Sequence, residues 1–454
     1  MTLDPTTLTP ATRNALDQRL ATEQSRQRLP SIVAGLVRDG VLVWSGAAGT
    51  LDGRGGGPVP TSKTQYRLGS ISKTFVAVEV LRLRDADLID LGDQIGQHLP
   101  EVPFGQVTIA QLLSHTSGLQ AETNGSWWER SSGTTWEALI ASGVCLRFTP
   151  GTTHHYSNVG YAVLGELIAR LRSTPWTEAV QAGILAPLGM TRTTPAPIEP
   201  AAPGLAVHPL ADLVHVEPTP DAVSMSPAGQ LWSTVDDMTQ WCAFLAGHTG
   251  DILASATLAE MLRPVAVVDT PQAPWTVAYA LGWQVWNAEG RRFGGHGGSM
   301  PGFLAQLRVD LDTGDGLVLM TNATSGLDTA GVDLLDLLHE REPVAPTPWT
   351  ADTDQSARLD LTGPWTWGTA SFTIRTASDG ALVLGDPGQG RGSRFRPEGD
   401  GFIGLDGYFR GEPMAVERDD SGRAVRLVLA SFVFTRTPYE PGIEVPGGLD
   451  GTWH

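Results

Sequence analysis

The pattern of apolar and polar positions predicts a helix followed by two paired strands in the first part of the chain. Thr9-Pro10 is typical of a helix start, and leucines recur on one face of the predicted helix at residues 11–26. Two apolar runs rich in β-branched residues follow at 31–37 and 41–45. The Asp39-Gly40 pair between them favours a tight turn, so this segment is predicted to be a β-hairpin.

Helical periodicity dominates from residue 75 to about residue 250, and strand patterns return after residue 280. The predicted helices include 161–171, 235–245 and 327–339, and the later strands span 280–285, 303–309 and 316–320. Strands and a helix therefore lie at both ends of residues 1–342. The expected fold class is α/β (α+β): one antiparallel sheet flanked by helices, with a helical insertion subdomain at about 75–250.

A proline-rich segment separates this domain from a second one. Residues 343–354 begin with Pro343-Val344-Ala345-Pro346 and are predicted to form a stiff, extended linker. Residues 355–454 contain short alternating segments and turns such as Asp379-Gly380. They predict a small antiparallel barrel, lipocalin-like in type, or a sandwich. Because this domain carries no catalytic motif, we expect it to support or cover the neighbouring site.

Composition narrows the classes of function. A hydrophobic content of 41% is enough for a sizeable core, and the formal net charge of −18 disfavours nucleic acid and anionic membranes as partners. No uninterrupted apolar run reaches the ~18 residues of a membrane span, and no export signal is evident, so we expect a cytoplasmic protein. Cys145 and Cys242 are interpreted as small buried hydrophobes, and a disulfide between them is left open.

The first chemical signal is a serine and a lysine three residues apart at a predicted helix start. Ser70 follows Gly69, and near-helical apolar periodicity continues from Phe75. Lys73 would share a helix face with Ser70 and, if neutral, could take the serine proton. The helix N-terminus favours negative charge, as an acyl-transfer oxyanion requires. Alone, this spacing also occurs by chance on helix surfaces.

Two later stretches supply partners for this pair. Tyr156-Ser157-Asn158 leads into a predicted helix, where the tyrosine could relay a proton and the asparagine could hold a substrate amide. The segment 293–303 is rich in glycine, contains His296-Gly297-Gly298 and leads into a predicted strand. Its glycines would let the backbone approach a ligand, and an exposed N–H there could complete an oxyanion hole.

The three motifs, in this order, resemble those of serine β-lactamase-like and penicillin-binding-protein-like hydrolases of the class C type. Stretches 112–119, 188–190 and 227–234 agree, and the resemblance covers roughly residues 29–338. It implies that Ser70 is the nucleophile and that Lys73 and Tyr156 transfer protons. Asn158 would bind the substrate and orient Lys73, and the backbone N–H groups of Ser70 and Ser299 would form the oxyanion hole. No cofactor or metal is implied.

The third motif departs from the pattern of β-lactamases, which resemble one another in having Lys-Thr-Gly where this chain has His296-Gly297-Gly298. A permanent cation and a hydroxyl for the substrate carboxylate are both missing. This form is similar to D-aminopeptidases, esterases and acyl-transferring relatives, and it argues against efficient β-lactam hydrolysis. His296 is expected to bind or polarise the substrate; the alternative is that it only closes the glycine loop.

Trp127 and Trp128 lie where relatives line the cleft, and Trp136 is close by. We interpret them as an aromatic wall for the acyl group, with ordinary core anchors as the alternative.

The leading functional hypothesis is a serine hydrolase that forms an acyl-enzyme at Ser70 and cleaves an ester or a D-residue-containing amide or peptide. The first alternative is an acyltransferase or peptide-cyclising thioesterase that passes the acyl group to an amine. The second is a non-catalytic penicillin-binding sensor. The expected partner is a small ester, amide or peptide substrate, and the oligomeric state is left open.

Overall fold

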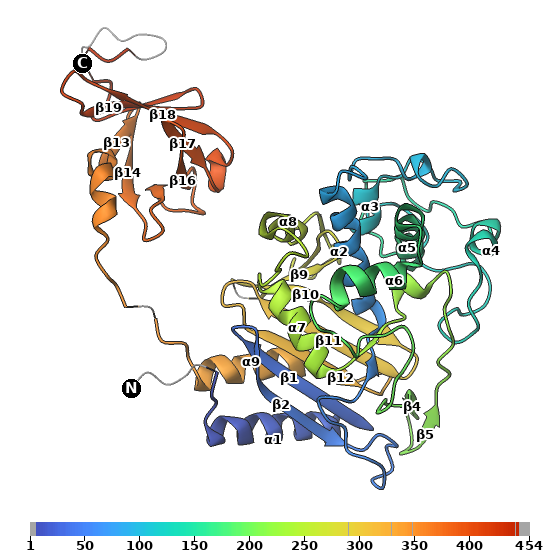
Figure 1. Ribbon diagram of the computed structural model, residues 1–454. Helices are drawn as coiled ribbons and strands as arrows, with labels where there is room; N and C mark the ends of the chain where they lie inside the picture. Colours follow the sequence, from blue (N-terminus) through green and yellow to red (C-terminus); the bar gives the residue numbers. More distant parts are fainter. Residues whose placement is uncertain (1–5, 289, 328, 347, 441, 445–454) are drawn as a thin grey trace. The chain divides into compact units, whose positions relative to one another are not determined.

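The computed structural model describes residues 6–288, 290–327, 329–346, 348–440 and 442–444 (Figure 1). The chain divides between Val344 and Ala345 into two compact units. The first unit holds a large antiparallel sheet with helices, and the second holds a closed β-barrel. The predicted mixed α/β fold class with a C-terminal barrel is therefore confirmed.

The sheet of the first unit joins segments from both ends of that unit. Within the described residues its strand order is β2-β1-β12-β11-β10-β9-β8-β7. The strands are β1 (Ser31–Arg38), β2 (Val41–Gly49), β7 (Ala266–Val267), β8 (Val277–Tyr279), β9 (Gln284–Ala288), β10 (Arg291–Met300), β11 (Phe303–Asp310) and β12 (Gly316–Thr321). β1 pairs with β12 from Ile32↔Thr321 to Val37↔Gly316. The central strands of the sheet are thus far apart in sequence.

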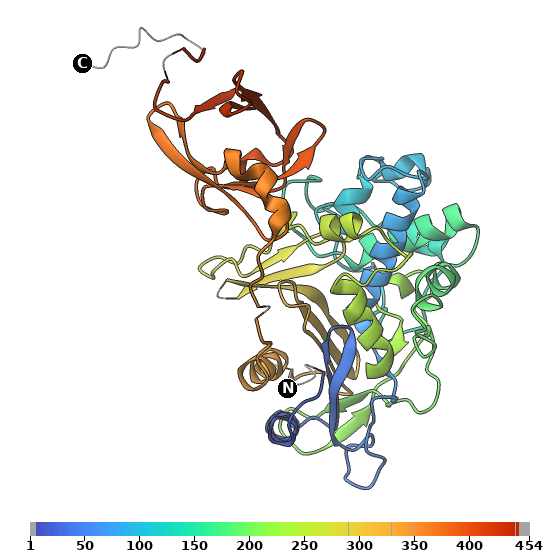
Figure 2. The ribbon, with the colours of Figure 1, turned by 60° about the vertical axis from the view of Figure 1, so that its left-hand side comes forward.

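Helices cover both faces of this sheet. α1 (Pro10–Arg26) and α9 (Ala330–Arg341) contact each other and lie along β2 and β12 (Figure 2). α7 (Val235–Leu245) packs on the other face against β1 and β12. Side chains alternate along a strand, so Ile32 of β1 joins the core under α1 and α9, whereas Val33 joins the core that includes α7.

The regular elements between β2 and β7 are mainly helices, as expected, although much of this region is irregular, and it carries the candidate chemistry. Its helices are α2 (Ser72–Asp85), α3 (Ile109–Leu113), α4 (Trp136–Ala141), α5 (Asn158–Arg172), α6 (Trp176–Val180) and α8 (Ser255–Met261), together with α7. The region also contains two short strand pairs. β3 (Tyr66–Arg67) pairs with β6 (Trp232–Ser233), and β4 (Leu205–Val207) pairs with β5 (Val214–Val216). α2 and α5 pack against each other inside this region.

The second unit is a barrel in which each strand pairs with its neighbours in sequence and β13 closes the ring with β20. Its described strands are β13 (Gly363–Trp367), β14 (Ala370–Thr376), β15 (Leu382–Leu384), β16 (Ser393–Glu398), β17 (Gly401–Gly404), β18 (Pro413–Arg418), β19 (Ala424–Leu429) and β20 (Phe432–Thr435). Large apolar side chains such as Trp365, Phe395 and Phe409 are buried in its core.

Most predicted elements of the first unit are confirmed, and two details were wrong. The helix at 235–245 and the hairpin around Asp39-Gly40 are present, and α1 starts one residue before its predicted position. The predicted strand at 280–285 is instead mainly the turn between β8 and β9, because Gly282 adopts a φ of +86°. Cys145 is only partly buried, and both cysteines are free thiols.

None of the helices in the described ranges is long and apolar enough to cross a membrane.

A buried ion pair joins β1 to the residue that precedes β12 and gives the first prediction. The Arg38 guanidinium on β1 binds the carboxylate of Asp315 at 2.8 Å, and both side chains are almost fully buried. Arg38→Met leaves that carboxylate without its main partner, so we expect a loss of ~3–5 kcal/mol in the free energy of unfolding by urea. Arg170→Met removes the solvent-accessible pairs with Glu101 and Glu166 and should cost no more than about 1 kcal/mol. Equal losses would contradict this account.

Candidate active site

Ser70 and Lys73 lie together at the start of α2. Ser70 sits in a short helical turn, Gly69–Ile71, and Lys73 follows in the first turn of α2. The Lys73 Nζ donates to Ser70 Oγ at 2.9 Å and to the Ala228 carbonyl oxygen at 2.6 Å. The Lys73 side chain is fully buried. This is the geometry of a nucleophile with an adjacent base.

The environment of Lys73 favours its neutral form. Burial lowers the pKa of Lys73 to about 7, while the carboxylates of Glu122 and Glu129 act in the opposite direction. Lys73 Nζ lies over the rings of Tyr156 and Tyr161, 5.0 Å and 5.6 Å from their centroids, and these contacts also oppose the loss of its charge. At neutral pH a substantial fraction of this lysine is therefore able to accept a proton.

Tyr156 connects Ser70 to a second tyrosine and to His296. Burial raises the pKa of Tyr156, and hydrogen bonding with Ser70 and Tyr279 opposes this rise only in part. The Tyr279 hydroxyl is hydrogen bonded to His296 Nε2, and His296 Nδ1 lies against the Gly297 carbonyl oxygen. If Nδ1 carries the proton, Nε2 accepts from Tyr279. Tyr156 is thus a neutral phenol that belongs to a buried series of hydrogen-bonded side chains.

His296 differs from its sequence-based expectation in two respects. It lies within strand β10, not in a loop, and both of its ring nitrogens are engaged by protein groups. Burial, with a smaller contribution from Lys73, lowers its pKa to about 3, so the imidazole is neutral. A role through Tyr279 fits this geometry better than direct binding of the substrate.

Asn158 is positioned by an acidic residue. Its Nδ2 donates to Glu122 Oε1 at 2.7 Å, and its buried Oδ1 has no hydrogen-bond partner in the described part of the chain. The expected hydrogen bond that orients Lys73 is absent there, because the bonds of Lys73 go to Ser70 and Ala228. Asn158 Oδ1 is thus a buried hydrogen-bond acceptor whose capacity is unused in the described part of the chain.

The two tryptophans expected to form an aromatic wall lie in different environments. Trp128 belongs to the main core and donates through Nε1 to Glu122 Oε2 at 2.7 Å. Trp127 is 60% exposed and donates to Glu129 Oε2, also at 2.7 Å. Trp136 is buried in the core as well. Trp128 and Trp136 thus match the alternative of core anchors, and Trp128 also holds Glu122 in place.

Glycines bring the strand β10 against the turn that carries Ser70. A Cβ at Gly69, where φ is +55°, would lie 2.5 Å from the Ser299 nitrogen, and one at Gly298 would lie 1.9 Å from the Leu68 carbonyl oxygen. β10 pairs with β9 only over Arg291–Gly295. Beyond Gly295, that edge of β10 therefore faces the Ser70 turn, where Ser299 N–H is a candidate oxyanion donor.

The resulting cavity has a volume of about 420 Å³. Its lining includes residues from all three motifs, namely Ser70, Tyr156, His296, Gly297, Gly298 and Ser299. Gln284, Leu304, Ala305, Gln306 and Leu327 complete it. The structure thus gathers around one cavity residues that are more than 200 positions apart in the sequence.

Three participants were missed by sequence reasoning: Tyr279, Glu122 and Glu129. Glu122 and Glu129 lie in an irregular segment whose sequence has no helix or strand pattern. Tyr279 ends a three-residue strand. The only signal in the sequence was position. Glu122 and Glu129 follow the 112–119 stretch, and Tyr279 precedes the glycine-rich strand. No group of three potential metal-ligand side chains was found among the residues that the structure describes.

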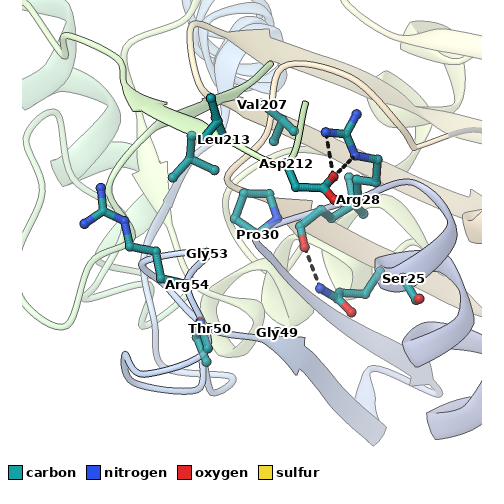
Figure 3. A pocket seen from close by; sticks show the side chains of 14 residues that line it. Ser25, Arg28, Pro30, Gly49, Thr50, Gly53, Arg54, Val207, Asp212 and Leu213 are labelled. Carbon is teal, nitrogen blue, oxygen red and sulfur yellow. Dashed lines mark hydrogen bonds and ion pairs between the residues drawn. The ribbon is translucent and has the colours of Figure 1, made fainter. Parts of the chain in front are cut away.

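A larger cavity, about 810 Å³, lies elsewhere in the first unit and shares no lining residue with this site (Figure 3). Two of its charged residues, Arg28 and Asp212, form an ion pair at 2.9 Å, and Gln24 donates to the Leu29 carbonyl oxygen. No serine with a lysine base lines it, so the smaller cavity is the candidate active site.

A serine on a helix start, a buried lysine and a neutral tyrosine around one cavity define a class of acyl-transfer enzymes. The Beta-lactamase family profile matches residues 13–340, which is most of the chain. The chain therefore belongs to the Beta-lactamase family. Residues 354–436 match a second profile, described as a domain of unknown function (DUF7586).

Individual relatives agree with this assignment. Beta-lactamase-like protein 2 of Dictyostelium discoideum is 28% identical over 53% of this chain and 47% of its own length, so the chain spans about half of that protein. Esterase EstB of Burkholderia gladioli is 33% identical over 36% of this chain and 46% of its own. The crystal structure of a D-stereospecific amidohydrolase from Streptomyces sp. matches with a TM-score of 0.60 and 29% identity, over 74% of this chain and 99% of that one. Family and relatives support an enzyme of the serine hydrolase class.

The close packing at Gly298 gives a prediction for this site. Gly298→Ala would place a methyl group 1.9 Å from the Leu68 carbonyl oxygen, so β10 must move away from Ser70. We expect the rate of Ser70 labelling by a fluorophosphonate to fall ~100-fold or more, as for loss of an oxyanion donor. Gly297→Ala is the matched comparison, because its Cβ would meet only Gln284 Oε1 at 3.9 Å. Similar losses in both variants would contradict the packing argument.

Proposed function

We propose that this protein is a serine hydrolase that forms an acyl-enzyme at Ser70 and releases the acyl group to water. The observation that carries the proposal is the fully buried Lys73, whose pKa is lowered to about 7 by burial and whose Nζ lies 2.9 Å from Ser70 Oγ. A base poised near the working pH, in contact with a nucleophile, is what acyl transfer requires.

In the proposed reaction, the same side chains act first in the acylation of Ser70 and then in the hydrolysis of the acyl-enzyme. Neutral Lys73 accepts the Ser70 proton as Oγ attacks the substrate carbonyl, and the backbone N–H groups of Ser70 and Ser299 stabilise the oxyanion. Tyr156, a neutral phenol in hydrogen-bonding range of Ser70, passes a proton to the leaving group and recovers one from Lys73. Water then attacks the ester, the same groups transfer the protons in reverse, and Ser70 is released as a free hydroxyl.

The acidic residues that act electrostatically on Lys73 favour a substrate with a positively charged amine. Glu122 is exposed and binds Asn158, and both Glu122 and Glu129 act electrostatically on Lys73. Burial raises the pKa of Glu129. An ammonium group next to the scissile carbonyl would meet these carboxylates, while its carbonyl or amide meets Asn158.

We therefore propose amides or short peptides of D-amino acids with a free amino group as the substrate class. The likeness to a D-stereospecific amidohydrolase supports this choice. Neutral His296 supplies no cation for the carboxylate of a β-lactam, which argues against β-lactams as the main substrates. An ester of the same amino acids would use the same groups, as the likeness to an esterase suggests.

The first test of this function is the pH dependence of acylation. Because Lys73 acts as a base only when neutral, the rate of fluorophosphonate labelling should rise with pH and level off above a midpoint near pH 7. Mass spectrometry should place the adduct on Ser70, and Ser70→Ala should abolish it. A non-catalytic sensor that does not acylate would show no adduct. A rate independent of pH between 5 and 9 would rule out Lys73 as the base.

The second test addresses the charged amine. Glu122→Gln removes a carboxylate charge, so kcat/KM for D-phenylalanine p-nitroanilide should fall ~10-fold or more, which is the cost of losing one charge-assisted hydrogen bond. The N-acetyl derivative lacks the ammonium group, and its smaller kcat/KM should change less than about threefold in the same variant. Equal losses for both substrates would contradict amine recognition while leaving the acyl-enzyme proposal intact. Product analysis with an added amine acceptor separates hydrolysis from acyl transfer.

A further inference from the structure

Aromatic side chains gather at one end of the C-terminal barrel. In a barrel whose strands run alternately up and down, every second connection lies at the same end. The connections at 368–369, 385–392, 405–412 and 430–431 therefore share one end. Trp367 ends β13, Phe432 begins β20, and Tyr408 lies in the connection between β17 and β18. These three residues, which we call the aromatic rim, come together at this end.

Arg391 lies on the aromatic rim. Its guanidinium carbon is 4.2 Å from the centroid of the Trp367 ring, 4.7 Å from that of Phe432 and 5.0 Å from that of Tyr408. The Trp367 and Phe432 rings also contact each other edge to face, with centroids 5.0 Å apart. Three rings around one cation restrict its orientation more than a single stacking contact does. Arg391 is thus held in a defined position by aromatic contacts alone.

The hydrogen-bond donors of Arg391 are free for a ligand. Its guanidinium makes no hydrogen bond or ion pair with any residue that the structure describes. Arg436 provides the contrast, since it stacks on Trp365 at 3.8 Å but donates to the carbonyl oxygens of Asp360 and Thr362. A stacked guanidinium presents its N–H groups in a planar fork that matches a carboxylate.

The rim is also accessible, and the barrel interior beneath it is filled. Tyr408 is 58% exposed and Arg391 is partly exposed. Trp365, Phe409 and Phe434 are buried below, within a continuous apolar core. A ligand would therefore bind across this end of the barrel, not inside it, with a flat or apolar group against Tyr408.

We propose that the aromatic rim and Arg391 form a binding site for an organic carboxylate that carries an aromatic or apolar group. The carboxylate accepts two hydrogen bonds from the Arg391 fork, and the attached group packs on Tyr408. The site is independent of the proposed reaction at Ser70, and it gives the second domain a binding role.

The test measures binding of 4-fluorobenzoate to the full-length protein by fluorine NMR, with 4-fluorobenzamide and 4-fluorobenzylamine as neutral and cationic probes. We expect saturable binding of the benzoate with a dissociation constant on the order of 1 mM. Arg391→Gln should weaken it at least about tenfold, and Tyr408→Ala should weaken it severalfold. Arg391→Lys keeps the charge but not the planar fork and should also bind less tightly than wild type.

Controls separate this site from other effects. Arg375→Gln removes an exposed arginine of β14 and should leave benzoate binding unchanged. Because every variant keeps the Ser70 cavity, binding there contributes equally to all of them. Arg391 is partly exposed, so the melting temperature of Arg391→Gln should match that of wild type.

Three results would overturn the proposal. The first is benzoate binding that does not saturate below about 10 mM. The second is equal benzoate affinity in wild type and in a folded Arg391→Gln variant. The third is tighter binding of 4-fluorobenzylamine that improves in Arg391→Gln, because the rim would then be a cage for external cations that Arg391 occupies.

Discussion

The candidate active site depends on the close approach of one strand to one helical turn. Gly69 and Gly298 have no side chain, and a Cβ at either position would overlap backbone atoms of the other segment. This contact sets Ser299 beside Ser70, and through β10 it also fixes His296 and its hydrogen bond to Tyr279. Ser70 comes from the helical region and β10 from the sheet, so two glycines determine how the two parts of the candidate site meet.

The electrostatics of the site follow from this enclosed geometry. Lys73 is fully buried, and burial lowers its pKa to about 7, while the carboxylates of Glu122 and Glu129 act in the opposite direction. For His296, burial and the charge of Lys73 both lower the pKa, so the imidazole is neutral. The same cavity thus holds one group that titrates near neutral pH and one that does not. Our proposal therefore assigns proton transfer to Lys73 and Tyr156 and a positioning role to His296.

The features that were predicted correctly from the sequence are those that neighbouring residues determine. The Ser70–Lys73 spacing, the Asp39-Gly40 hairpin and the helix 235–245 depend on neighbouring residues, and each could be identified in the sequence. Tyr279, Glu122 and the position of Trp128 depend on contacts between distant segments, which no local pattern encodes. The error at 280–285 has the same origin, since Gly282 turns where Ala77 of α2 leaves no room for a side chain. The barrel could be predicted from its short alternating strands. The cluster of Arg391 and its three aromatic rings could not, because its four residues come from four separate segments.

The order of strands in the large sheet also constrains how the chain folds during synthesis. β1 is made early, but its partner β12 ends at Thr321, and the strand that faces Ser70 ends at Met300. Ser70 and Lys73 therefore leave the ribosome more than 200 residues before the backbone that completes their site. Pairings at such sequence separation form slowly, because a long loop must close first. Ser70 and Lys73 thus remain without their enclosing strand until nearly all of the first unit has been made, so the candidate site is completed late in synthesis.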